Sequence, residues 1–183
     1  MAPSSTAATV SARAVSVRSA SAAETRELGA LLAGVAAAGD RIALIGPLGA
    51  GKTQLAKGFA RGLGIAEVVN SPSFTLMAEY AGRLRLFHQD LYRLGGAEEA
   101  IAGGLLDDRQ EAGVTLTEWA DRLAPGLDPD RLELRFFLAD GDERRIELST
   151  TDPAGHAGYL SVAAGWGSRD VAAGKGGEME SGA

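Results

Sequence analysis

The sequence predicts an α/β fold, a three-layer sandwich in which helices cover a mixed, largely parallel central sheet. The strongest indication is Arg41–Gly46, a short and almost entirely apolar run that suits a central strand buried on both faces. A glycine-rich turn and then a helix follow it, because Leu55, Phe59 and Leu63 recur at helical spacing. Further along, two pairs of strand-like segments flank short turns and predict hairpins.

The first elements are predicted from small and capping residues. Residues 1–10 are small and polar, and we expect them to form a disordered arm. The alternation of residue types in Arg13–Ser19 predicts a first strand. Ser21 and Glu24 have the spacing of a capping box, which predicts a helix that runs to about Ala38.

The remaining elements complete one domain over residues 11–150. Beyond it, residues 151–183 are rich in Gly, Ala and Ser, which predicts a flexible tail, although Tyr159 and Trp166 leave room for a docked segment. In chain order we expect a helix at Lys52–Leu63, a hairpin of residues 73–80 and 83–90, helical structure within 96–112, a strand at Val114–Trp119, and a hairpin of residues 131–140 and 143–150.

Composition excludes several classes of function. The chain has 183 residues and a net charge of −6 without a basic block, which disfavours direct binding to bare nucleic acid. It has no cysteine, so disulfides, zinc–thiolate sites and thiol catalysis are excluded. No apolar run approaches the roughly 20 residues of a membrane span, and the N-terminus does not resemble a signal peptide. We therefore expect a cytoplasmic protein with no membrane partner.

The segment Gly46–Thr53, GPLGAGKT, fits the P-loop pattern G-x-x-x-x-G-K-[ST]. Gly49 and Gly51 allow the backbone to wrap a polyphosphate with its amides pointing inward, and the following helix presents its positive end. Lys52 supplies a compact ammonium that fits a tight loop better than a planar guanidinium. Thr53 offers a hydroxyl to Mg²⁺. The predicted nucleotide-binding residues of the loop are Leu48, Gly49, Ala50, Gly51, Lys52 and Thr53.

A hydrolytic P-loop also needs acidic groups near the metal and a group that senses the γ-phosphate. Asp90 ends a predicted strand and would reach the metal through water, unless it is a turn residue that caps a helix. Glu118 also ends an apolar strand, where it would bind Mg²⁺ or orient water, unless it is a solvated neighbour of a core tryptophan. The hydroxyl-rich loop Asn70–Leu76 is either a switch over the γ-phosphate or an ordinary Ser-Pro turn. We interpret His88 as a packing residue without a catalytic role.

Four stretches of the chain, taken together, match one known family. They are GPLGAGKT, NSPSFTL, FHQDLYRL and TLTEW, in this order, within Ala23 to Leu148. They resemble the bacterial tRNA threonylcarbamoyladenosine biosynthesis ATPases (TsaE), and H-x-D-x-Y-R-L followed by E-W is the most specific part. The resemblance implies a P-loop NTPase fold and a weak, Mg²⁺-dependent ATPase activity that depends on partner proteins. Those partners, the tRNA threonylcarbamoyl-transferase complex proteins, modify the adenosine beside the anticodon. The acidic chain would then contact tRNA only indirectly.

The resemblance also implies roles for individual residues. The family's P-loop lysine and threonine match Lys52 and Thr53, and the acid of its H-x-D pattern matches Asp90. The metal-linked glutamate of its E-W pair matches Glu118, and its Ser-Pro-Thr segment matches residues 71–73. We thus expect these roles: catalytic Lys52, Asp90 and Glu118; metal ligands Thr53 and Glu118; and a nucleotide contact from Ser73.

Two positions depart from the family pattern. Pro47 stands where the family usually has an acid, and it lacks an N–H. The amides nearest the phosphates come later in the loop, so we expect binding to survive. Ser73 replaces a threonine, which keeps the hydroxyl and removes a methyl group.

Two other functions remain open on the sequence alone. A small-molecule kinase would need a lid with arginines that reach the transferred phosphate, and Arg83, Arg85, Arg93 and Arg109 form no recognisable lid. A non-hydrolytic, nucleotide-dependent binding module would hold ATP as a structural ligand. A GTPase is less favoured because the guanine-reading N-K-x-D motif is absent.

Overall fold

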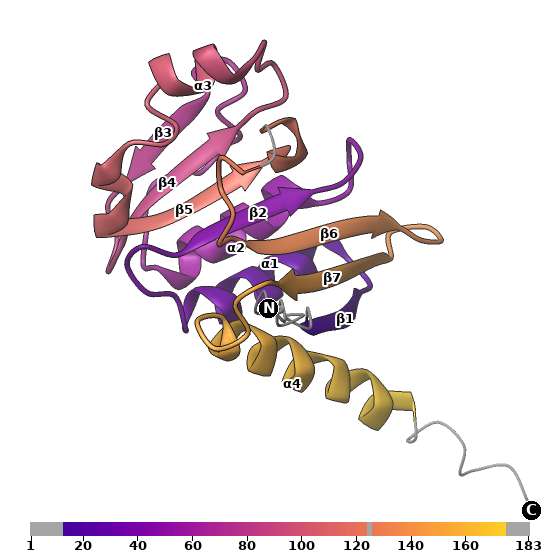
Figure 1. Ribbon diagram of the computed structural model, residues 1–183. Helices are drawn as coiled ribbons and strands as arrows, with labels where there is room; N and C mark the ends of the chain where they lie inside the picture. The colour runs from indigo at the N-terminus through magenta and orange to yellow at the C-terminus, as the bar shows by residue number, and fades with distance from the viewer. Residues whose placement is uncertain (1–12, 124–125, 175–183) are drawn as a thin grey trace, which may run out of the picture.

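The computed structural model describes residues 13–123 and 126–174, and in this part of the chain seven strands form one sheet (Figure 1). The strand order is β1-β7-β6-β2-β5-β4-β3. The predicted arm of residues 1–10 lies outside the described residues. The strands are β1 Arg13–Ser19, β2 Arg41–Ile45, β3 Met77–Tyr80, β4 Arg85–Asp90, β5 Gly113–Glu118, β6 Leu132–Leu138 and β7 Arg144–Thr150.

The middle of the sheet is parallel and its margins are antiparallel. Strands β4, β5, β2 and β6 run parallel to one another, whereas β3 pairs antiparallel with β4 and β7 pairs antiparallel with β6 and β1. The mixed α/β sheet is therefore confirmed, and so are both hairpins, β3–β4 and β6–β7. Because parallel strands end at the same edge, β2, β4 and β5 bring their carboxyl ends together.

One face of the sheet is covered by two long helices, α1 (Ala22–Ala33) and α2 (Lys52–Gly62). Helix α1 ends at Ala33 and not near Ala38, because the chain turns there: Arg83 donates to the carbonyl of Ala33, and the amide of Ala37 donates to Asp40 Oδ2 at 2.8 Å. The apolar core lies between these helices and the strands. Its fully buried members include Leu28, Leu32, Leu44, Leu55, Phe59, Leu86 and Leu116.

The opposite face is covered only in part. Short elements lie there: α3 (Ala97–Ala102), η1 (Asp108–Ala112), which contacts β5, and η2 (Ala120–Arg122), which packs against β2. The helical structure predicted within 96–112 is broken at Gly103 and Gly104, where Gly104 adopts a positive φ of 68°. A buried hydrogen-bonded network joins this layer to the sheet, because Gln89 donates to the carbonyl of Leu105 at 2.9 Å and accepts from Thr117 at 3.0 Å.

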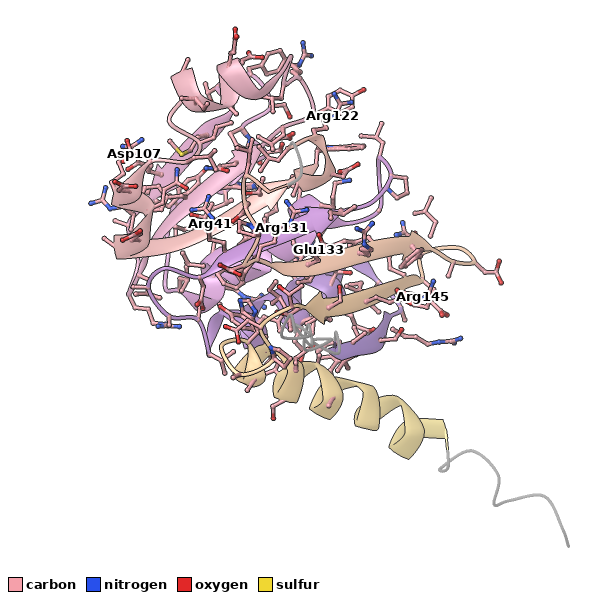
Figure 2. All side chains as sticks on the ribbon, in the orientation of Figure 1. Arg41, Asp107, Arg122, Arg131, Glu133 and Arg145 are labelled. Carbon is pink, nitrogen blue, oxygen red and sulfur yellow. The ribbon has the colours of Figure 1, made fainter. Side chains whose placement is uncertain are left out.

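Over β6 and β7 the same face carries charged side chains. Arg131 and Arg135 both donate to Glu133, at 2.9 and 3.0 Å. Figure 2 shows Arg131, Glu133 and Arg145 on the side of these strands that is turned away from α1 and α2. The third layer of the sandwich is therefore thin and confined to one half of the sheet.

Residues 157–174 form helix α4 (Ala157–Gly174), in the region predicted to be a flexible tail. The composition concealed the apolar stripe of this helix, whose members Tyr159, Leu160, Ala163 and Trp166 are buried in the main core. Trp166 Nε1 donates to the carbonyl of Arg18 in β1 at 2.8 Å. The structure therefore shows the alternative of a docked segment, which Tyr159 and Trp166 had indicated in the sequence. No helix in the described ranges combines the length and apolar character needed to cross a bilayer.

Candidate nucleotide-binding site

The glycine-rich loop joins the end of β2 to the start of α2, as predicted. Gly49 and Gly51 adopt φ values of 75° and 104°, in the left-handed region that favours glycine. Gly51 occupies the N-cap position of α2 without a side chain to cap the helix. The first amides of α2 and its positive dipole end are thus presented at the loop, which suits an anion.

Helix α2 is held in place by very close packing against α1. A Cβ atom added at Gly58 would collide with the backbone carbonyl of Arg26, so this position of α2 admits only glycine at the observed separation. Arg26 also donates to Gln54 Oε1 at 2.5 Å. The loop residues 46–53, α1 and α2, which we call the phosphate-loop half of the site, therefore rest on a tightly packed base.

Lys52 is 4% exposed and lies inside the loop that it follows. Its Nζ donates to the carbonyls of Gly46 at 2.6 Å and Pro47 at 2.8 Å, and it lies 3.8 Å from the centroid of the Trp119 ring. Burial lowers the pKa of Lys52, and the nearby carboxylates of Glu118 and Asp90 partly oppose this shift. Pro47 thus contributes a carbonyl to the lysine, although it offers no amide.

Glu118 ends β5 next to the start of α2. Its Oε2 accepts from the hydroxyl of Thr53 at 2.9 Å, and its Oε1 lies 2.9 Å from His88 Nε2. Glu118 and His88 are both buried. A hydroxyl and a carboxylate oxygen are hard ligands of the kind that Mg²⁺ prefers, and Mg²⁺ usually takes its other ligands from water and phosphate. Thr53 and Glu118 therefore fit a magnesium site beside a bound polyphosphate.

Within residues 13–123 and 126–174, no three His, Asp or Glu side chains are grouped as a metal centre. The donor set at this site is accordingly small. It suits an ion that arrives with its nucleotide better than one held by an all-protein cage.

Asp90 ends β4 and binds the hydroxyl-rich loop. Its Oδ2 accepts from Ser71 and from Ser73, the latter at 2.7 Å, and its Oδ1 accepts from the amide of Tyr92 at 2.9 Å. We call Ser71, Ser73 and Asp90 the serine latch. The neighbouring Phe74 is 85% exposed, whereas Pro72, between the two serines, is buried.

These groups surround one cavity of about 460 Å³. Asp90 and Glu118, which are paired in register at the ends of β4 and β5, lie on the same side of the sheet as Lys52 and Thr53. The structure thus brings together every residue that the sequence predicted for the site. Those that line the cavity are Leu48, Gly49, Ala50, Gly51, Lys52, Thr53, Ser73, Asp90 and Glu118.

Sequence reasoning missed several residues at this cavity. Trp119 adopts a left-handed conformation, with φ of 58°, and its ring lies against Lys52. The centroids of the Tyr92 and Trp119 rings are 5.1 Å apart. Arg93 also lines the cavity, and its Cζ lies 4.5 Å from the centroid of the Phe74 ring. The sequence motifs E-W (Glu118-Trp119) and D-x-Y-R (Asp90–Arg93) contain these aromatic and basic residues and could have indicated them. His88 was assigned to packing, whereas the structure places it against Glu118.

Comparison with known proteins identifies the family. The family model described as "Threonylcarbamoyl adenosine biosynthesis protein TsaE" matches residues 19–146. The chain belongs to the TsaE family. A tRNA threonylcarbamoyladenosine biosynthesis protein TsaE of Bacillus subtilis is 43% identical over 127 residues, which is 69% of this chain and 79% of that protein. The TsaE of Streptomyces coelicolor is 36% identical over 149 residues, 80% of this chain and 96% of the relative.

A solved structure supports the same family. The crystal structure of Bacillus subtilis YdiB superposes with a TM-score of 0.63 at 34% identity, covering 87% of this chain and 97% of that one. Helix α4 lies beyond the residues that the TsaE model matches. The nucleotide-binding cavity and both strands that carry its acids lie inside them.

Proposed function

We propose that this TsaE-family protein binds and hydrolyses ATP as an accessory protein in threonylcarbamoyl transfer to tRNA. In this proposal it acts through the tRNA threonylcarbamoyl-transferase proteins, which modify the adenosine beside the anticodon, and contacts tRNA only through them. Membership of a family named for threonylcarbamoyl adenosine biosynthesis supports the pathway. The geometry of the cavity supports the chemistry.

The observation that carries the proposal is the contact between Thr53 and Glu118. Their oxygens lie 2.9 Å apart at the first turn of α2, beside a loop built for phosphate. In a P-loop the hydroxyl and an acid of this kind hold Mg²⁺, which would neutralise charge on the phosphate oxygens. The amides of Leu48–Gly51 and the ammonium of Lys52 would bind the same phosphates.

The serine latch supports a role for nucleotide in controlling partner contacts. Ser71 and Ser73 reach the cavity from one side and Asp90 holds them there. A γ-phosphate in the cavity would compete for the same hydroxyls, so binding and hydrolysis would reset the position of the loop. We therefore assign Asp90 to the coupling between hydrolysis and the loop, and Glu118 to the metal.

The test is phosphate release from MgATP by the purified protein, measured alone and with its native transferase proteins. We expect slow release that rises when the partners are added, and ATP-dependent recovery of those partners in a pull-down. Transfer of the phosphate to an added metabolite in place of water would indicate a kinase. ATP binding with no release, with or without partners, would indicate a binding module.

A further inference from the structure

Below the metal-linked acid lies a buried histidine that the proposed chemistry leaves without a role. His88 precedes the end of β4 and is 0% exposed. In the parallel pair β4–β5, His88 is opposite Leu116 and Asp90 is opposite Glu118. Side chains two residues apart on a strand share a face, so His88, Asp90, Leu116 and Glu118 all point to the side where α2 lies. His88 is thus the diagonal neighbour of Glu118.

The contact holds one oxygen of the carboxylate while the other is engaged elsewhere. His88 Nε2 lies 2.9 Å from Glu118 Oε1, and the hydroxyl of Thr53 lies 2.9 Å from Oε2. Both oxygens of Glu118 therefore have partners, and the plane of the carboxylate is fixed between β4 and α2. The preceding position on this face, Leu86, is apolar and equally buried, so filling space on this face does not by itself call for an imidazole.

The other ring nitrogen identifies which atom carries the proton. His88 Nδ1 is buried and has no hydrogen-bond partner among the described residues. A proton on Nδ1 would leave a buried donor unsatisfied, and a carboxylate can only accept. The nitrogen that faces the carboxylate is therefore the one that carries a proton, and His88 donates from Nε2 to Glu118.

We propose that His88 is a positioning residue: it donates from Nε2 to Glu118 and thereby turns the free lone pairs of that carboxylate toward Thr53 and a magnesium ion. This inference rests on the proposed function, since it assigns a partner to the metal-linked acid. Groups that orient a metal ligand in this way commonly change metal affinity or activity by 10- to 100-fold when they are removed.

The first test compares four proteins in phosphate release from ATP, each titrated with Mg²⁺ at fixed pH with the native partners present. His88→Leu removes the donor and keeps the bulk, and His88→Gln places an amide N–H near the position of Nε2. Leu86→Ala destabilises the same strand and face without touching Glu118. We expect His88→Leu to need at least about ten-fold more Mg²⁺ for half-maximal release, with KM for ATP within two-fold of the wild type.

His88→Gln should recover most of the loss, and Leu86→Ala should keep the wild-type Mg²⁺ requirement. An equal Mg²⁺ requirement in His88→Leu and Leu86→Ala would overturn the positioning role. Failure of the wild-type protein to release phosphate would instead count against the proposed function.

A second measurement needs neither nucleotide nor turnover. The chain has two histidines, His88 and His156, so a nitrogen spectrum of the imidazole rings is readily assigned with His156→Asn. We expect His88 to carry its proton on Nε2, with slow exchange, in the wild-type protein. A proton on Nδ1, or rapid averaging between the two tautomers, would overturn the inference even if the variants fail to fold.

Discussion

The two halves of the cavity are held by different forces. The phosphate-loop half rests on helices so close that Gly58 admits no side chain, and its glycines set the path of the loop. The opposite half depends on the serine latch, in which two hydroxyls bind one carboxylate beside an exposed Phe74. Close packing resists displacement, whereas a few hydrogen bonds exchange readily with those of a ligand. The first half is suited to binding, and the second to responding.

The largest effect on turnover is expected from removing the positive charge of the phosphate-loop half. Lys52→Ala removes the ammonium that would stabilise the transferred phosphate, so turnover should fall by at least about 100-fold, or roughly 2.7 kcal/mol. Nucleotide affinity should fall as well. Phosphate release and calorimetric titration with ATP measure the two losses, and wild-type turnover in this variant would contradict the assignment.

Glu118→Ala is the matched comparison, because it removes the metal ligand and keeps the lysine. We expect turnover to fall by about 100-fold while affinity for ATP changes only a few-fold. An unchanged rate would exclude Glu118 from the reaction.

The second effect concerns the base of the same half. Gly58→Ala would force α2 away from α1, since the added methyl meets the carbonyl of Arg26, and we expect a loss of about 3 kcal/mol in the free energy of unfolding. Gly165→Ala is the control, because a Cβ atom there meets nothing within 4 Å. In mid-helix it should gain up to about 1 kcal/mol. Urea denaturation compares them, and equal effects would show that the helices are not closely packed.

A smaller effect is expected from the opposite half. Ser71→Ala with Ser73→Ala opens the serine latch, which should cost about 1 kcal/mol of stability. Hydrogen exchange in residues 70–76 should accelerate, and turnover with partners should fall more than ATP affinity. Ser73→Thr keeps the hydroxyl and serves as the control. If exchange is unchanged in the double variant, the loop is held by something other than Asp90.

The smallest expected effect is on the pH dependence of the free energy of unfolding, and it concerns Lys52 in the phosphate-loop half. Burial lowers the pKa of Lys52 below its ordinary 10.5, so the folded protein releases this proton more readily than the unfolded chain. Its contribution destabilises the fold at neutral pH and diminishes as pH rises from the lowered pKa toward 10.5. Lys52→Met should therefore be slightly more stable than the wild type near pH 7, with the difference shrinking in alkali. Parallel unfolding curves across this range would contradict the shift.

Much of the phosphate-loop half was predictable from the sequence. The apolar strand, the glycines and the amphipathic helix are local signals, and each lies where it was expected. The ends of β4 and β5 were also located, because Asp90 and Glu118 lie at the ends of segments with strand-like sequence. These predictions depend on neighbouring residues in the chain, which a sequence shows directly.

What escaped prediction depends on contacts between distant segments. His88 meets Glu118 only because β4 lies beside β5 in one register, and sequence spacing does not specify that pairing. Helix α4 was missed since its alanines and glycines resemble a linker, while its stability comes from Tyr159 and Trp166 packing against the core. Trp119 lies over Lys52 through a left-handed backbone that no propensity favours.

Helix α4 affects whether copies of the protein can associate with one another. Strand β1 ends the sheet on one side, and an outermost strand offers unpaired backbone groups to any other chain that can add to it. The helix packs against this strand (Figure 1). Trp166 donates a hydrogen bond to the backbone carbonyl of Arg18. A chain that ends before residue 157 would lack the helix that covers β1. We expect such a chain to self-associate through β1 while the residues of the cavity keep their arrangement.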